Sequence, residues 1–187
     1  MKAKSRWILA IDPSGNFEEG KGTTGLALFD TKLNAIISTK VVDARNYPDQ
    51  LGFWDDIVNE MMKCIDDCDD GVHVVIEDYL LYASKASAQT NSRFETPQLI
   101  GALKYVLHGI MIPFSFQRAV DVKNRWTDKI LEHHGYIKLV DAEAKGYSHC
   151  HGYSSYALPI NDQRLMSHEL DAIRHAVHYA TFKNKEK

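Results

Sequence analysis

The chain of 187 residues contains few cysteines, few prolines and no excess of positive charge. Its three cysteines, Cys64, Cys68 and Cys150, are an odd number, which argues against a disulfide framework and indicates free thiols in a reducing compartment. With 44% hydrophobic and 25% charged residues, the composition excludes a disordered or low-complexity protein. A net charge of −3 excludes a globally basic nucleic-acid binder but leaves room for a local basic face.

Long hydrophobic runs are also missing. The apolar run near the N-terminus, within residues 1–12, is too short to span a bilayer or to form a signal sequence, and a charged residue ends it at Asp12. No other stretch approaches 18 apolar residues. We therefore expect a soluble, cytoplasmic protein with a single domain over residues 1–187, a length that lets one core bury most of its apolar surface.

Charge is unevenly distributed along the chain. Residues 81–139 hold eight Lys and Arg against four Asp and Glu, a net charge of +4, whereas the remainder carries −7. Such a basic half is compatible with binding a polyanion, although the charges taken alone favour a solvated helix face. If the partner is DNA, the phosphate-binding side chains should be Lys85, Arg93, Arg118, Lys123, Arg125 and Lys129.

The hydrophobic pattern predicts an α/β protein. Short apolar runs indicate strands at residues 7–12, 26–30, 35–42, 72–77 and 111–116. Helical periodicity indicates a first helix that begins at Pro48 and ends before residues 69–71. It indicates further helices at residues 97–110, 120–134 and 167–182, and Ser167 is expected to be the N-cap of the last one. Residues 142–163 are expected to form a loop. This order predicts a mixed central sheet with helices on both faces.

Two acids end apolar strands. Asp12 follows Ile-Leu-Ala-Ile, and Glu77 follows Val-Val-Ile. A carboxylate in such a place is costly to desolvate unless a cation pairs with it, and this edge of a sheet is where α/β proteins bind ligands. On the last helix, His168 and Asp171 are three residues apart and share a face, whereas Glu169 points elsewhere.

Three carboxylates and one imidazole suit Mg²⁺ or Mn²⁺ better than a structural zinc ion. Two such ions about 3.5–4 Å apart hydrolyse phosphodiester bonds in many nucleases. In such a site of this chain we would expect Asp12 to bridge both ions, Glu77 to bind one of them and Asp171 the other. Taken singly, each residue has a simpler role: Asp12 in a turn, Glu77 in an ion pair, and His168 and Asp171 at a helix start. Their combination favours the metal site.

A second metal hypothesis is a zinc site. Cys64 and Cys68 lie four residues apart on a predicted helix and so face the same way, and His149, Cys150 and His151 lie in the predicted loop. This hypothesis is weaker because the spacing lacks a Cys-x-x-Cys pair.

Several segments, taken in order, resemble the RuvC-type Holliday junction resolvases of the RNase H-like superfamily. Residues 8–14 (Ile-Leu-Ala-Ile-Asp-Pro-Ser) and 24–27 (Thr-Gly-Leu-Ala) resemble the opening strands of that family. Residues 75–79 (Val-Ile-Glu-Asp-Tyr) resemble its second acidic strand end. The later matches are 99–103 (Leu-Ile-Gly-Ala-Leu), Val122-Lys123 followed by Lys129, and 168–176 (His-Glu-Leu-Asp-Ala-Ile-Arg-His-Ala).

The resemblance implies an RNase H-like fold with the metal-binding positions at Asp12, Glu77, His168 and Asp171. It implies a homodimer that cleaves four-way DNA junctions, with Lys123 or Lys129 acting at the scissile phosphate as a point charge. The sequence departs from the family at Ser14, in the longer loop of residues 14–22, in residues 142–163, and at His168, where many members have Asp. Such divergence would suit a phage-encoded member.

A dimer would match the two equivalent scissile strands of a four-way junction, and the helix at 97–110 is the best candidate for its interface. Tyr79 and Tyr82 follow Glu77 closely and could wedge between bases at the branch point, although burial in the core is an equally good interpretation. Two other functions remain open. One is a nuclease with broader preference for branched DNA, flaps or RNA–DNA hybrids, and the other is a non-catalytic DNA-binding module on the same fold.

Overall fold

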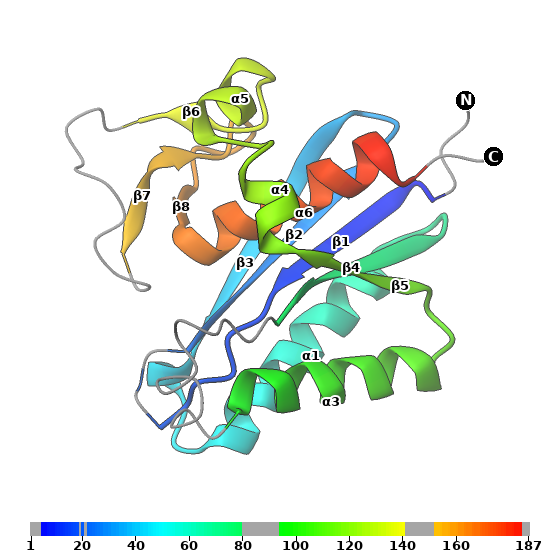
Figure 1. Cartoon of the computed structure of the whole chain (residues 1–187), viewed down its shortest axis with the longest axis vertical. Helices are drawn as coiled ribbons and strands as arrows, with labels where there is room; N and C mark the ends of the chain where they lie inside the picture. Colours follow the sequence, from blue (N-terminus) through cyan, green and yellow to red (C-terminus); the bar gives the residue numbers. More distant parts are fainter. Residues whose placement is uncertain (1–4, 19, 21, 80–93, 141–151, 185–187) are drawn as a thin grey trace.

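The computed structural model describes residues 5–18, 20, 22–79, 94–140 and 152–184. Its centre is a five-stranded mixed sheet with the strand order β3-β2-β1-β4-β5 (Figure 1). β1 pairs antiparallel with β2 and parallel with β4, and β5 is parallel to β4. The strands are β1 (Trp7–Asp12), β2 (Thr23–Asp30), β3 (Ala35–Asp43), β4 (Val72–Asp78) and β5 (Phe114–Arg118).

Helices cover both faces of this sheet, as predicted. α1 (Gln50–Asp66) and α3 (Glu95–Gly109) pack on one face, and α6 (Ser167–Phe182) with α4 (Ala119–Lys123) packs on the other (Figure 1). A short 3₁₀ helix, η1 (Ala44–Asn46), follows β3. The alternation of side chains along β1 sets the two cores: Ile8 and Ala10 face α6, whereas Leu9 and Ile11 face α1 and α3.

A small second sheet extends the α6 side of the molecule. It contains β6 (Lys138–Leu139), β7 (Tyr153–Ala157) and β8 (Arg164–Met166) in the order β6-β7-β8. The expected loop at 142–163 is therefore wrong for residues 153–157. Arg164 Nε donates to the Ser154 carbonyl and ties β8 to β7, a long-range contact that the local sequence pattern does not reveal.

The single helix predicted over residues 120–134 is also wrong. Two short helices replace it, α4 and α5 (Asp128–His133), with a turn between them. Trp126 is buried in this turn, and Thr127 has an extended backbone (φ −67°, ψ 160°) that starts α5. The Trp126 carbonyl accepts a hydrogen bond from Arg174 Nε. Tertiary contacts with α6 thus interrupt a segment whose local pattern is helical.

Two predicted boundaries shift for local reasons. The strand predicted at 111–116 begins at Phe114, because Met111 adopts a left-handed conformation (φ 58°) and the Ile112 N–H returns to the Leu107 carbonyl, which ends α3. Ser167 is the first residue of α6 and not its N-cap. Met166 holds the cap position, and its N–H donates to the Glu169 carboxylate at 2.8 Å.

No helix within the described ranges is long and apolar enough to cross a membrane.

Candidate functional site

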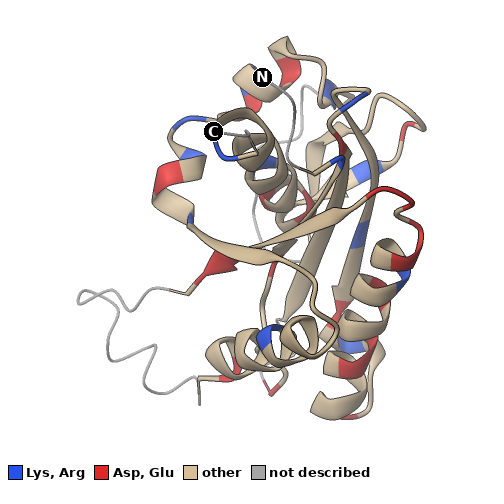
Figure 2. Ribbon diagram, turned by 90° about the vertical axis from the view of Figure 1, so that its right-hand side faces the viewer, with Lys and Arg blue, Asp and Glu red and all other residues tan. Residues whose placement is uncertain are grey.

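The two predicted strand-end acids lie side by side. β1 and β4 are neighbouring parallel strands with Ile11 opposite Ile76, so Asp12 and Glu77 lie at the same edge of the sheet. Alternation turns both carboxylates toward α6, on the same face as Ala10 and Val75. In Figure 2 the end of β4 is the red arrowhead, coloured for its acidic residues, just before the described residues end at 79.

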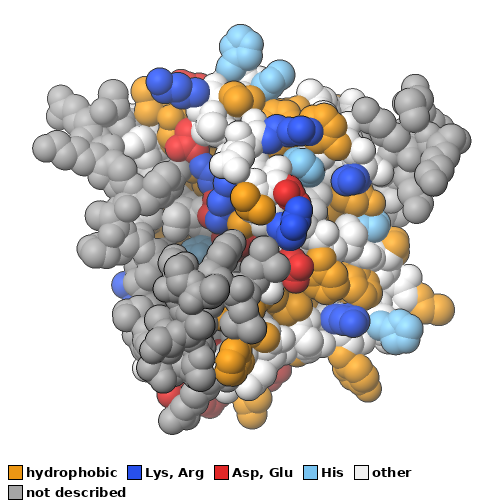
Figure 3. Space-filling view, viewed as in Figure 1, with side chains coloured by type: hydrophobic (Ala, Val, Ile, Leu, Met, Phe, Trp, Pro, Cys, Tyr) orange, Lys and Arg blue, Asp and Glu red, His pale blue; other side chains and the backbone are white. Residues whose placement is uncertain are grey.

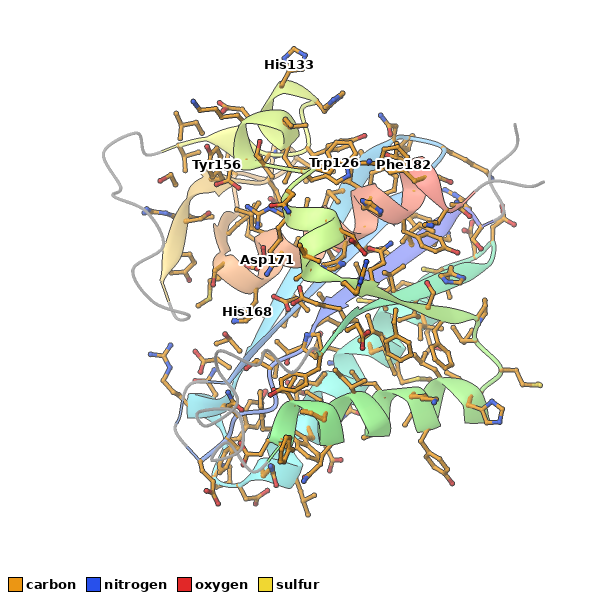
Figure 4. All side chains as sticks on the ribbon, viewed as in Figure 1. Trp126, His133, Tyr156, His168, Asp171 and Phe182 are labelled. Carbon is orange, nitrogen blue, oxygen red and sulfur yellow. The ribbon has the colours of Figure 1, made fainter. Side chains whose placement is uncertain are left out.

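Gly25 lets α6 approach these acids. It pairs with Asp12 in the β1–β2 register, and a Cβ atom at Gly25 would lie 2.2 Å from the backbone carbonyl of His168. Only a residue without a side chain fits there. The start of α6 therefore sits directly on the end of β1, with His168 and Asp171 on neighbouring turns toward the sheet edge (Figure 4).

Asp12 and His168 form the first pair of the site. His168 Nδ1 lies 2.6 Å from Asp12 Oδ2, and Asp12 is only 5% exposed. Burial raises the pKa of Asp12, and the His168 charge offsets this only in part, while Glu77 and Asp171 raise it further. Burial lowers the pKa of His168, but the nearby Asp12 outweighs burial and raises it overall. The pair thus holds a proton more firmly than either group would in water.

Lys123 joins the other two acids. Its Nζ lies 2.8 Å from Asp171 Oδ2 and 3.6 Å from Glu77 Oε2. Burial lowers the pKa of Lys123, but these two carboxylates and Asp12 raise it overall, so the ammonium stays charged. Burial raises the pKa of Asp171, and the charges of Lys123 and Arg174 outweigh it and hold the pKa below its usual value.

Two further residues of α6 contact the acids, although neither was among the predicted site residues. Arg174 forms ion pairs with both Asp171 and Asp128. His175 is fully buried, and its Nε2 lies 2.8 Å from Glu77 Oε2. Their spacing in the sequence could have indicated this contact. Arg174 lies three residues after Asp171, and His175 lies four after Asp171 and seven after His168, so all of them share one face of the helix.

The loop after Asp12 is anchored on the start of α3. The Phe17 N–H donates to Glu95 Oε2 at 2.8 Å, and the Gly15 N–H donates to Thr96 Oγ1 at 3.0 Å. Glu95 is buried and also accepts a hydrogen bond from Gln50. The long loop that departs from the family pattern is therefore held in place beside the acids by a carboxylate that the sequence analysis did not single out.

A cavity of about 390 Å³ opens beside Asp171. Its lining comes from the α4–α5 turn and the start of α6: Lys123, Thr127, Asp128, Ser167, Asp171 and Arg174. Basic and acidic side chains mix on this face of the molecule, over α4 and the start of α6 (Figure 3). Asp171 and Lys123 are thus reachable from solvent on the α6 side of the sheet.

The donor set suits a hard divalent cation. Asp12, Glu77 and Asp171 supply carboxylate oxygens and His168 supplies one nitrogen. Burial is the main cause of the raised pKa of Asp12, and repulsion from Glu77 and Asp171 adds to it, a repulsion that a bound cation would relieve. Within the described residues no three of these side chains converge on one point as a preformed centre, and each carboxylate is paired with a basic side chain of the protein.

The other predicted DNA-binding residues lie on several elements, and Arg125 lies at the far end of α6 from His168 and Asp171. Arg118 is exposed and pairs with Asp121, and exposed Arg125 stacks on Phe182 with 4.6 Å from its guanidinium carbon to the ring centre. Lys129 lies exposed on α5, and Tyr79 is half-buried just after β4. The predictions for Tyr82, Lys85 and Arg93 fall outside the described residues.

The zinc hypothesis gains no support from the described part of the chain. Cys64 lies in the last turn of α1 and Cys68 just beyond its end, and burial raises the pKa values of these thiols to about 11 and about 12, so both are neutral at pH 7. Cys68 Sγ donates to the Cys64 carbonyl. His149, Cys150 and His151 lie outside the described residues.

Comparison with known proteins identifies the fold. No protein-family model matches the sequence, and no curated protein matches it. Among solved structures, T. thermophilus RuvC in complex with a Holliday junction substrate matches with a TM-score of 0.62 and 15% sequence identity. The match covers 94% of this chain and 93% of that chain. It confirms the predicted RNase H-like architecture, a mixed five-stranded sheet with helices on both faces.

Proposed function

We propose that this chain is a metal-dependent, structure-selective endonuclease that cuts four-way DNA junctions. The observation that carries the proposal is the cluster of Asp12, Glu77, His168 and Asp171 at one sheet edge. The structural neighbour that holds a Holliday junction shares this fold over nearly the whole chain, which supports a branched DNA substrate.

The four clustered side chains are those that would hold Mg²⁺, or Mn²⁺ in its place, with two ions per site. Bound divalent cations would supply an activated water and would stabilise the leaving oxygen in phosphodiester hydrolysis. Asp12 is the most buried of the three carboxylates and interacts electrostatically with His168, Glu77 and Asp171, so it would be a central ligand of the bound cations.

Lys123 is the residue we assign to the scissile phosphate. Its ammonium contacts Glu77 and Asp171 and lines the cavity beside them, so it is charged and positioned where a phosphate would approach. A compact ammonium binds a phosphate as a point charge. Lys129, the second candidate from the sequence, lies exposed on α5 and is better placed to bind the DNA backbone at the edge of the site.

A homodimer would place two such sites on the two equivalent strands of a junction. The predicted interface helix, α3, buries Leu99, Leu103 and Leu107 in the core of one molecule. Its remaining face, however, leaves Tyr105 80% exposed, and Met111 just beyond its end is 88% exposed. These apolar side chains support α3 as the contact between two copies.

One cleavage experiment tests the proposal. A synthetic four-way junction, a replication fork, a plain duplex and an RNA–DNA hybrid are each incubated with the protein in Mg²⁺, Mn²⁺ or EDTA. We expect paired symmetric nicks on the junction alone, with 5′-phosphate and 3′-hydroxyl ends, and no cleavage in EDTA. Cleavage of the fork or the hybrid at the same rate as the junction would select a broader nuclease. Junction binding without cleavage in either metal would select a non-catalytic DNA-binding module.

A further inference from the structure

His175 is buried among polar groups that link two strands of the sheet to the last helix. Its side chain is fully enclosed, yet both ring nitrogens lie near oxygen atoms. Nε2 is 2.8 Å from Glu77 Oε2, and Nδ1 is 3.0 Å from Gln117 Oε1. Glu77 and Gln117 are direct neighbours in the β4–β5 register, so one imidazole spans both strands from above.

The Gln117 amide completes this arrangement. Its nitrogen is buried and has no hydrogen-bond partner among the described residues. A half-turn of the amide makes that nitrogen donate to His175 Nδ1. The imidazole then keeps its proton on Nε2 and donates it to Glu77, so both ring nitrogens of His175 have a hydrogen-bond partner.

We propose that His175 is a positioning residue that orients the Glu77 carboxylate for the divalent cation, with Gln117 fixing the orientation of the imidazole. This inference rests on the proposed function. Carboxylates and imidazoles that bind metals are regularly held by such outer hydrogen bonds, and loss of one typically weakens metal binding by about 10–100-fold. Lys123 also contacts Glu77, but at 3.6 Å and through a flexible side chain, so it constrains the carboxylate less.

The hydrogen bond also explains the ionisation of Glu77. Burial raises the pKa of this carboxyl, but the hydrogen bond from His175 and the charge of Lys123 outweigh burial and hold the pKa below its ordinary value.

Two substitutions of similar polarity but different reach test the role. In His175→Gln the amide nitrogen can take the place of Nε2 and still donate to Glu77, whereas the shorter side chain in His175→Asn cannot reach it. We expect the affinity for Mn²⁺ alone, measured by titration calorimetry of the full chain without DNA, to stay within about threefold for the first and to fall at least tenfold for the second. Turnover of the junction should fall in parallel, with KM unchanged.

His178→Asn is the matched control. His178 is buried on the same helix, about one turn later, and its Nδ1 has no partner among the described residues. We expect this variant to bind Mn²⁺ as the unmodified protein does. Equal Mn²⁺ affinity for His175→Gln and His175→Asn would overturn the inference. Should His175→Asn fail to fold, Gln117→Leu decides, because unchanged Mn²⁺ affinity there would equally overturn it and a loss of threefold or more would support it.

Mn²⁺ binding and junction cleavage by the unmodified protein distinguish a wrong function from a wrong role of His175. If the unmodified protein neither binds Mn²⁺ nor cuts a junction, the proposed function is wrong. If it does both and the His175 variants match it, only the positioning role is wrong.

Discussion

Each clustered carboxylate is held by a basic side chain that reaches it from another part of the chain or from the next turn of α6. Asp12 meets His168, Glu77 meets Lys123 and His175, and Asp171 meets Lys123 and Arg174. These contacts reduce the cost of burying three acids at one edge of the sheet. They also fix the direction in which each carboxylate points, so substitutions at this scale should separate metal binding from folding.

Asp12→Asn should abolish cleavage and preserve junction binding. The substitution keeps the shape of the side chain but removes the charge that a divalent cation needs, while phosphate contacts elsewhere are untouched. Because burial raises the pKa of Asp12, removing its charge should not destabilise the protein. The checks are junction cleavage in Mg²⁺ and gel-shift binding in EDTA. Substantial residual cleavage would remove Asp12 from the chemistry.

His168 should make the stability of the protein depend on pH in EDTA. Asp12 raises the pKa of His168 above its ordinary value of 6.5, against the opposing effect of burial. A group with a raised pKa contributes stability that is complete below its unfolded pKa and is lost as the pH rises through its folded pKa. We therefore expect the free energy of unfolding, measured with urea, to fall as the pH rises above about 6.5.

His168→Asn should flatten this decline, because the titrating group is gone. The complementary measurement is the pH–rate profile in Mg²⁺, where we expect His168→Asp to remove one ionisation. A pH dependence of stability and rate that is the same with and without the imidazole would rule out this role for His168.

At the scale of elements, the sequence was enough to predict which strands and helix carry the acids, but not which basic side chains contact them. Apolar runs that end in Asp12 and Glu77, and a helix carrying His168 and Asp171, are local patterns and were found correctly. The break after Lys123 depends on Trp126 and its contact with Arg174, which are distant in sequence. Local periodicity contains no information about such contacts, so one long helix was predicted where two short ones form.

The approach of α6 to β1 gives the prediction at this scale. Gly25→Ala would place a methyl group 2.2 Å from the His168 carbonyl, so the helix start must move. We expect a loss of stability of about 1–3 kcal/mol from overpacking, together with a large loss of cleavage, since His168 and Asp171 move with the helix.

Gly101→Ala is the control for this change. A Cβ atom at Gly101 meets no other atom within 4 Å, and the position is inside α3. Alanine is preferred over glycine in a helix, so stability should rise slightly, by about 0.5–1 kcal/mol. Thermal unfolding measures both variants. Equal stability of Gly25→Ala and the unmodified protein would show that α6 does not depend on this close approach.

At the scale of the whole molecule, a net charge of −3 requires that DNA bind through a local basic surface. Six basic residues are assigned to phosphates, so junction affinity should fall by about a thousandfold between 50 and 200 mM salt. The double variant Arg125→Ala, Lys129→Ala should reduce the salt slope by about two. Lys32→Ala, at an exposed ion pair with Asp70, should leave the slope unchanged. A flat salt dependence in gel-shift titrations would exclude phosphate contacts as the source of affinity.

The exposed residues at α3 lead to the prediction about assembly. Tyr105 and Met111 expose apolar surface that one molecule alone leaves in water, and a second copy would bury it. Tyr105→Glu should place a charge in that contact and convert a dimer to a monomer in analytical ultracentrifugation. The two nicks of a junction should then become uncoupled, so that singly nicked junctions accumulate. Leu33→Glu, at an exposed apolar residue of the β2–β3 turn, should leave the dimer intact. If the unmodified protein is monomeric and still makes paired nicks, α3 is not the contact that joins two active sites on one junction.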